Sequence, residues 1–307
     1  MTKLSGWIIY NGQLKSDKFL DYVTWFKQSA EKANIHLEVF TNDEILVSND
    51  KTKPLLFSKT WCENFHPDFV HYADKDLHLA RQLESMNIPL FNRSKSIEIC
   101  DNKSLMHHHL VEKSIPTPMT IIAPMTFNGI EVKEVTYIER IIEAIGLPMI
   151  IKEAFGSFGQ QVYWIDSKEQ LEIMAKKLAG KDHLYQKPVH HSLGKDIRIN
   201  VVGGKVVASM KRTSQTDFRA NVTAGGSTTP YDPSLEEKTL AVQAAAAVGA
   251  DFAGVDLLLE KEGPVVCEVN SNPHIRSIYE CTGIDVAVPM IEHIDAILSG
   301  QKERKLS

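Results

Sequence analysis

Short apolar runs alternate with helical repeats over the first 95 residues. The runs have the length of strands and lie at 6–10, 37–40, 55–57, 69–72 and 88–91. Between them, 17–33 and about 74–86 carry apolar residues at helical spacing. Strands that alternate with helices predict a small α/β domain with a largely parallel sheet. No GxGxxG motif follows the first strand, so we do not expect a dinucleotide there.

The rest of the chain also mixes helical and strand patterns. Residues 94–113 predict one or two helices, with Asp101 as an N-cap and Pro116 and Pro118 ending the run. Further helices are expected at 137–145, 169–178, 235–248 and about 286–298, and further strands at 148–151, 183–186, 197–202 and 206–212. The pattern favours a mixed α/β protein of two or three domains.

Two apolar runs, 257–259 and 265–269, are separated by Lys261-Glu262-Gly263, which predicts a β-hairpin. A turn centred on Glu262 would place Asp256 directly opposite Glu268. The two-residue period of a strand would put Asn270 on the same face as Glu268.

Two carboxylates and a carboxamide would then converge among valines and leucines. Such buried oxygen ligands are costly without a cation, and Mg²⁺ suits them because it shares its coordination between carboxylates, water and phosphates. The hairpin therefore favours a magnesium site with a triphosphate partner. The alternative is a hairpin whose acidic residues face water.

A second hairpin is expected around Gly203-Gly204, between the strands at 197–202 and 206–212. A two-residue turn would pair Asp196 with Lys211, and Arg198 would share the face of Asp196. Arg212 would lie on the other face unless a β-bulge intervenes.

A glycine-containing loop, Gly156-Ser157-Phe158-Gly159, follows a strand that leads to Lys152. Its backbone amides could close over phosphates, although it lacks the GxxxxGK[ST] spacing of a Walker A loop. An ordinary hairpin turn is the alternative. His107-His108-His109 and His190-His191 are consecutive, so their side chains diverge, and we interpret them as surface or core imidazoles instead of metal ligands.

Amino-acid composition narrows the class of protein to which the chain can belong. With 43% apolar and 24% charged residues the chain is typical of a globular protein, and a net charge of -5 gives no electrostatic support for nucleic acid or an anionic membrane as a partner. We expect neither a signal peptide nor a transmembrane stretch from this sequence. The four cysteines form no CxxC pair, which favours reduced thiols and a cytoplasmic protein: Cys62, Cys100, Cys267 and Cys281.

These motifs occur in an order that resembles the ATP-grasp superfamily and, within it, the RimK-like α-L-glutamate ligases, over roughly residues 95–295. The matching elements are Lys103, Lys152, the loop 156–159, Gln186 to Val189, Asp196-Ile197-Arg198, Arg212, Asp217-Phe218-Arg219-Ala220-Asn221, Gly254-Val255-Asp256 and Glu268-Val269-Asn270. The resemblance implies an N-terminal Rossmann-like α/β domain (1–95), a central domain with a lid loop (96–187) and a C-terminal antiparallel-sheet ATP-binding domain (188–307).

The resemblance also implies roles for individual residues. Lys103 and Lys152 would contact the phosphates of ATP, Arg212 would act with Lys152 on the transferred phosphate, and Asp256, Glu268 and Asn270 would hold Mg²⁺, which Mn²⁺ could replace. Further nucleotide contacts are expected from Gly156, Ser157, Phe158, Gly159, Gln186, Lys187, Pro188, Val189, Asp196, Lys211, Arg219 and Asn221. Pro188 has no amide hydrogen, so an adenine would be bound by the amide of Val189 or Lys187. Contacts to substrate are expected from Arg198, Arg219, Asn221, Asn272 and His274.

The function implied is an ATP-dependent carboxylate–amine ligase that works through an acyl phosphate, with a carboxylate acceptor and an amine, such as glutamate or another amino acid, as substrates. A homo-oligomer is compatible with the sequence. A small-molecule kinase on the same fold and a nucleotide-binding regulatory protein are the alternatives. Two positions depart from the family pattern: Lys187-Pro188 stands where an acidic-aromatic pair is common, and His274 where a glycine is common.

Overall fold

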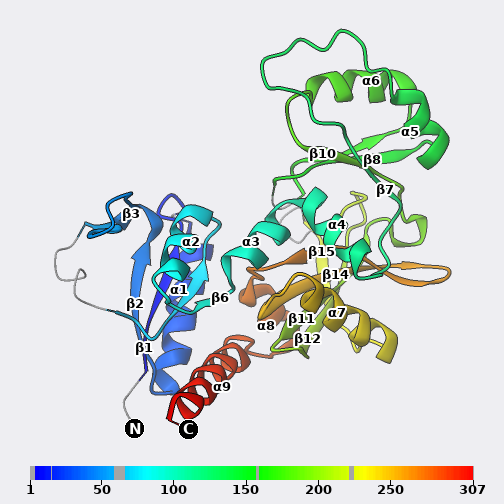
Figure 1. Cartoon of the computed structure of the whole chain (residues 1–307). Helices are drawn as coiled ribbons and strands as arrows, with labels where there is room; N and C mark the ends of the chain where they lie inside the picture. Colours follow the sequence, from blue (N-terminus) through cyan, green and yellow to red (C-terminus); the bar gives the residue numbers. More distant parts are fainter. Residues whose placement is uncertain (1–3, 15, 59–65, 157–158, 221–224, 307) are drawn as a thin grey trace.

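The computed structural model describes residues 4–14, 16–58, 66–156, 159–220 and 225–306. Within these residues, three larger sheets, each with its own helices, follow one another along the chain, and a small two-stranded sheet accompanies the first (Figure 1). Three predicted site residues, Ser157, Phe158 and Asn221, and also Cys62, lie outside the described residues.

The first sheet contains four parallel strands in the order β2-β1-β5-β6. They are β1 (Ser5–Tyr10), β2 (His36–Thr41), β5 (Phe69–Ala73) and β6 (Leu90–Phe91). Helices α1 (Asp17–Lys32) and α2 (Leu77–Ser85) contribute to separate hydrophobic clusters that include residues of this sheet. The predicted parallel α/β domain is thus confirmed, but 55–57 forms β4 (Leu55–Phe57) of a separate hairpin with β3 (Ile45–Val47).

Two short helices link this domain to the rest of the chain: α3 (Ser94–Asp101) and α4 (Lys103–Glu112). The predicted N-cap Asp101 is wrong by one residue, because Asp101 ends α3 and the side chain of Asn102 accepts a 2.9 Å hydrogen bond from the Leu105 amide. Met106 and Leu110 are buried in the core of the C-terminal sheet.

The second sheet is antiparallel, in the order β7-β10-β8-β9. Its strands are β7 (Thr120–Ile122), β8 (Met149–Glu153), β9 (Val162–Ile165) and β10 (His183–Gln186). Helices α5 (Ile138–Ile145) and α6 (Lys168–Lys177) pack on the face that carries Tyr185. Lys152 pairs with Leu184, so Lys152 and Gln186 point from the opposite face.

The third sheet is antiparallel, in the order β13-β12-β11-β14-β15. Its strands are β11 (Lys195–Val202), β12 (Lys205–Thr213), β13 (Ser227–Pro230), β14 (Phe252–Glu260) and β15 (Gly263–Asn270). Helix α7 (Leu235–Ala247) packs with α4 on one face, while α8 (Ile275–Thr282) and α9 (Ala287–Leu306) pack against the other. The sequence pattern missed β13 and α8.

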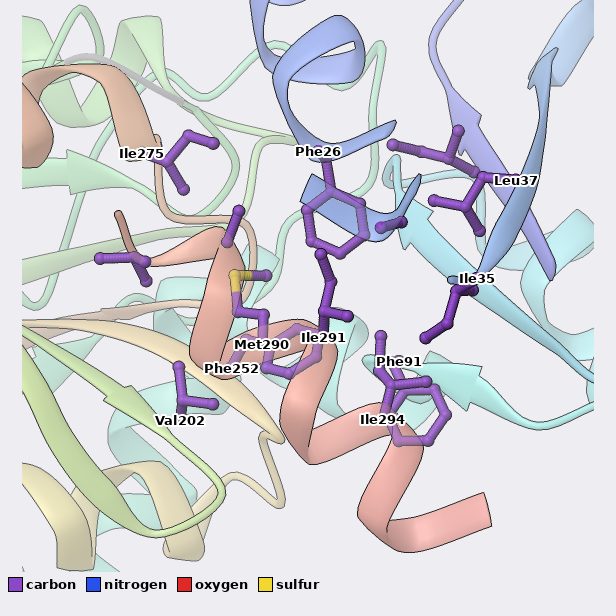
Figure 2. Packing of buried hydrophobic residues seen from close by; sticks show 14 of the residues in the cluster. Phe26, Ile35, Leu37, Phe91, Val202, Phe252, Ile275, Met290, Ile291 and Ile294 are labelled. Carbon is purple, nitrogen blue, oxygen red and sulfur yellow. The ribbon is translucent and has the colours of Figure 1, made fainter. Parts of the chain in front are cut away.

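One hydrophobic core joins the first and third sheets. Figure 2 shows Phe26 of α1 close to Met290 and Ile291 of α9, with Phe252 of β14 in the same cluster. Phe26 is completely buried and Phe252 is 1% exposed, and burying an aromatic side chain contributes roughly 1.5–3 kcal/mol. The Trp25 indole also donates a 3.0 Å hydrogen bond to Asp285. The first and third sheets therefore share a packed interface.

The predicted division at 1–95, 96–187 and 188–307 stays a prediction. Packing adds one detail to it, because Ile99 to Ile115 contribute to the core of the third sheet, whereas the cluster around the second sheet includes residues from Ile121 onwards. Cys100, Cys267 and Cys281 are free thiols. Within the described residues, no helix is long and apolar enough to cross a membrane.

Candidate active site

The hairpin β14–β15 carries the predicted metal ligands in the expected register. Asp256 lies opposite Glu268, and Gly254 lies opposite Asn270. The turn differs from the prediction, because Glu260 pairs with Gly263 across the two residues Lys261 and Glu262. A β-bulge next to Asp256 then shifts the register by one residue and restores the Asp256–Glu268 pair.

The hairpin β11–β12 contains the bulge that the sequence left open. Its register shifts between Asn200 and Val201, so Arg212 lies opposite Asp196. The predicted pairing of Asp196 with Lys211 is wrong: Lys211 lies opposite Ile197, and strand alternation puts it on the face away from Arg212. A role for Lys211 at this site therefore loses its geometric basis.

Two arginines bind two aspartates on the third sheet, and all four side chains are largely buried. Arg212 Nε and Nη2 donate to Asp196 at 2.6 and 2.7 Å, and Arg212 Nη2 also lies 2.9 Å from Asp256 Oδ2. Arg198 donates from Nη2 to Asp256 Oδ2 at 2.7 Å and from Nε to Oδ1. Such forked pairs are the strong form of charge-assisted hydrogen bond. We refer to Asp196, Arg198, Arg212 and Asp256 as the arginine cluster.

Burial raises the pKa of both aspartates, but their arginine partners offset it to different extents. Burial raises the pKa of the Asp196 carboxyl, and Arg212 only partly opposes this effect. For Asp256, burial acts in the same direction, but Arg198 and Arg212 outweigh it and hold the pKa of the carboxyl below its usual value. Burial opposes the charge of Arg212, whereas Asp256 and Asp196 raise the pKa of its guanidinium above its ordinary value. The cluster is therefore held together mainly through Arg212, which contacts both acids.

Two buried lysines from different elements reach neighbouring residues of β15, Lys103 at Glu268 and Lys152 at Cys267. Lys103 opens α4, and its Nζ donates to the Gly156 carbonyl at 3.0 Å and lies 3.8 Å from Glu268 Oε1. Lys152 of β8 reaches the third sheet, where its Nζ lies 3.5 Å from Cys267 Sγ. The lysines are 8% and 7% exposed. Ammonium groups this deeply buried are costly without anionic partners, so their convergence favours an anion at this place.

The glycine loop is held at both described ends. Gly156 has a φ of +153°, in the region that favours glycine, and a Cβ there would meet the Gln161 side chain. Lys103 binds the Gly156 carbonyl, and Arg219 donates to the Gly159 carbonyl. Arg219 is itself paired with Asp217. The structure thus brings Arg219 to the glycine loop, and its predicted contacts to nucleotide and substrate stay a prediction.

In the segment Lys187-Pro188-Val189, which we call the hinge, one backbone amide is already hydrogen-bonded. The Lys187 amide donates a 2.9 Å hydrogen bond to the Met119 carbonyl. Pro188 has no amide hydrogen, so Val189 is the hinge residue left to bind a nucleobase through its amide.

The predicted substrate residues Asn272 and His274 lie where the third sheet meets the first. The Asn272 carboxamide is 3.3 Å from the Asp74 carbonyl oxygen at the end of β5. His274 caps the start of α8, and its ring centroid lies 5.3 Å from that of Phe19 on α1. Arg198, the third predicted substrate residue, belongs to the arginine cluster.

Sequence reasoning missed His107. It is 3% exposed, and Gln186 of β10 lies against it, with 3.1 Å between Gln186 Nε2 and His107 Nε2. Burial, with smaller effects of Lys152 and Lys103, lowers the pKa of His107 to about 3. The spacing of four residues from Lys103 on one helix was the available signal, because it places both side chains on the same face.

Comparison with known proteins identifies the family. The model of the RimK-like ATP-grasp domain matches residues 100–294. A probable alpha-L-glutamate ligase of Maridesulfovibrio salexigens is 36% identical over 221 residues, which cover 71% of this chain and 70% of that protein. One of Mannheimia succiniciproducens is also 36% identical over 221 residues, with 71% of each chain covered. The chain belongs to the RimK-like ATP-grasp family.

Solved structures agree with this fold. D-alanine–D-alanine ligase of Bacillus anthracis complexed with ATP has a TM-score of 0.71 at 17% identity, over 98% of this chain and 99% of that one. A RimK domain ATP-grasp protein of Sphaerobacter thermophilus has a TM-score of 0.68 at 18% identity, over 93% and 98%. The family and fold predicted from the sequence are therefore confirmed.

Proposed function

We propose that this protein is an ATP-dependent carboxylate–amine ligase. The observation that carries the proposal is that Lys103 of α4 and Lys152 of β8 reach neighbouring residues of β15, Glu268 and Cys267. A pair of buried cations next to a carboxylate suits a triphosphate whose charge is shared between lysines and a metal. The relatives named probable alpha-L-glutamate ligases support this reaction class and suggest glutamate as the amine.

The donor set suits Mg²⁺. Glu268 is partly exposed, with Lys103 at 3.8 Å, and the Asn270 amide group donates to Gly254, so its carbonyl oxygen can serve as a ligand. Asp256 can contribute only by exchanging a bond to Arg198 or Arg212. No group of three His, Cys, Asp or Glu side chains among the described residues could hold a metal, which is consistent with a site that uses Asn270. The metal would supply charge neutralisation at the phosphates.

In the first step, an oxygen of the substrate carboxylate attacks the γ-phosphorus of ATP, and the bond from this phosphorus to the β,γ-bridging oxygen breaks. Lys103 and Lys152 would hold the phosphates and stabilise charge that develops on them. The products are an acyl phosphate and ADP. The role predicted for Arg212 at the transferred phosphate requires that it release a bond to Asp256, and the nucleotide contact predicted for Asp196 competes with Arg212 in the same way.

In the second step, the amine nitrogen attacks the carbonyl carbon, the bond to phosphate breaks, and the amine loses a proton as the amide forms. Side chains near the junction of the first and third sheets, including Asn272 and His274, are proposed to select the substrates. Neither step requires a covalent bond to the protein.

Hydroxylamine tests the proposal. With ATP, Mg²⁺ and an acid substrate but no amine, a ligase should form a hydroxamate and release ADP and phosphate in equal amounts, because hydroxylamine intercepts the acyl phosphate. Lys152→Ala should abolish this product, whereas Lys261→Ala, in the exposed turn of β14–β15, should retain it. A stable phosphate ester that resists hydroxylamine would instead identify a kinase and overturn the proposal.

A further inference from the structure

The carboxamide of Gln186 is fixed by two neighbours. Its Nε2 lies 2.9 Å from Thr120 Oγ1 and 3.1 Å from His107 Nε2. Thr120 Oγ1 donates its single proton to the Pro118 carbonyl at 2.8 Å, so only its lone pairs face Gln186. The atom that faces Thr120 must therefore be the amide nitrogen of Gln186, and not its oxygen.

The second amide hydrogen of Gln186 then points at His107 Nε2, which has to accept it. A protonated imidazole would present a hydrogen there and would repel the amide. Burial keeps His107 neutral, since it lowers the pKa to about 3. The imidazole proton consequently resides on Nδ1, an atom that is buried without a hydrogen-bond partner in the described part of the chain. An unpaired Nδ1 costs stability, which a purely structural histidine would have no reason to bear.

With its nitrogen held in this way, the Gln186 oxygen faces away from both neighbours. Gln186 lies on the face of the second sheet that also carries Lys152, and it directly precedes the hinge. Gln186 as a whole is 2% exposed, and among the described residues no hydrogen-bond donor contacts this oxygen. The oxygen is thus an unused acceptor of fixed orientation at the edge of the site.

We propose that His107 is a positioning residue which, through Gln186, makes the site select a purine with a 6-amino group. The inference rests on the proposed function, because it needs a nucleobase at the hinge. A fixed acceptor would accept a hydrogen from the amino group of adenine. A 6-oxo purine would place oxygen against oxygen. If the carboxamide were free to rotate, it would serve both bases equally.

The test compares the binding of ATP with that of ITP, which differs from ATP in having a 6-oxo group, by titration calorimetry on the full-length protein with Mg²⁺. Wild type should bind ATP at least about tenfold more tightly, the order expected for one fixed hydrogen bond against a repulsive contact. His107→Leu should bring the ratio of the two affinities close to one. His107→Gln should keep it, because its Oε1 can accept the same hydrogen.

His108→Leu is the matched control, since His108 is the exposed neighbour and its replacement should leave the ratio unchanged. Thr120→Val removes the second acceptor of the Gln186 amide and should also lower the ratio of the ATP and ITP affinities. This variant provides the test if His107→Leu does not fold. A wild-type ratio in both His107→Leu and Thr120→Val, or a wild type that binds both nucleotides equally, overturns the inference. A wild type that binds neither nucleotide overturns the proposed function itself.

Discussion

The two hairpins of the third sheet are built alike but differ in charge. Each has a two-residue turn and a bulge, and each bulge sets a charged residue of the returning strand opposite an aspartate. In β11–β12 the pair is Asp196 with Arg212, which attract each other. In β14–β15 the pair is Asp256 with Glu268, which repel.

The difference shows how the fold tolerates two acids face to face. Asp256 takes both of its arginine partners from the neighbouring hairpin, whereas Glu268 has Lys103 at 3.8 Å. The charged residues that β11–β12 contributes to the arginine cluster therefore pair with one another and with Asp256 of β14–β15. Glu268 is left available for a ligand. We infer that the ion pairs of β11–β12 contribute mainly to stability when no ligand is bound, whereas Glu268 serves ligand binding.

The largest effect should follow from Arg212→Leu. Removing the guanidinium leaves Asp196 without its bidentate partner and Asp256 with Arg198 alone, both buried, so the free energy of unfolding should fall by about 3–5 kcal/mol. Urea-induced unfolding measures this. Lys211→Ala is the matched control on the opposite face and should change stability by less than about 0.5 kcal/mol. Equal losses in the two variants would contradict the division between the hairpins.

Glu268→Gln should separate function from stability. ADP formation should fall by roughly a hundredfold or more, because the carboxylate proposed to hold the metal loses its charge. The free energy of unfolding should stay the same or rise slightly, since repulsion with Asp256 is relieved. ADP release and urea unfolding are the two measurements, with Glu262→Gln in the turn of the same hairpin as control. Full activity in Glu268→Gln would refute the metal assignment.

A pH titration of stability should distinguish the arginine cluster from buried histidines. Burial lowers the pKa of His71 and of His107 to about 3, whereas an unfolded histidine titrates near 6.5. Between these values the unfolded chain binds protons that the folded chain does not, so stability should fall as pH decreases below about 6.5. The slope should reach about 1.4 kcal/mol per pH unit for each histidine.

The contribution of Asp256 to stability changes in another pH range. Because its pKa is lowered, its contribution is present above about 3.8 and is lost only below that pH. His107→Gln should therefore flatten the loss between pH 6.5 and 4 without changing the steep loss below pH 4. An unchanged slope above pH 4 would show that another group causes it.

The smallest effect concerns the turns. Gly203 and Gly204 both have left-handed φ values, +55° and +75°, whereas in β14–β15 the positive φ falls on Gly263. Gly204→Ala should cost about 1 kcal/mol from backbone strain alone, since open space surrounds the added Cβ. Glu262→Ala, in the other turn, should cost less than half as much. Thermal unfolding of the two variants gives the comparison.

The sequence predicted the hairpins well because their apolar runs and glycines are local signals. It predicted Asp256 opposite Glu268 for the wrong reason. The centre of the turn lies half a residue before the assumed position, and the bulge next to Asp256 compensates for this shift in register. The same kind of bulge reversed the prediction for Arg212 and Lys211. A bulge depends on how a strand packs on both neighbours, and no pattern along one strand records it.

Long-range contacts set a second limit. The spacing of His107 from Lys103 could place it on the face of the site, but its role depends on Gln186, 79 residues away, and on the hydroxyl of Thr120. Site residues that belong to family motifs, such as Lys103 and Lys152, could be named from the sequence because their order along the chain was informative. Their convergence on one place could only be seen in three dimensions.

The core shared by α1 and α9 has a consequence for how the protein is made. Trp25 and its partner Asp285 are 260 residues apart, and Phe26 packs in the same cluster as Met290 and Ile291. A ribosome therefore releases α1 long before it releases the helices that cover it. During most of translation, the apolar face of α1 has to remain exposed or be shielded by a chaperone. Synthesis, more than the mature fold, is the stage at which this chain is most open to aggregation.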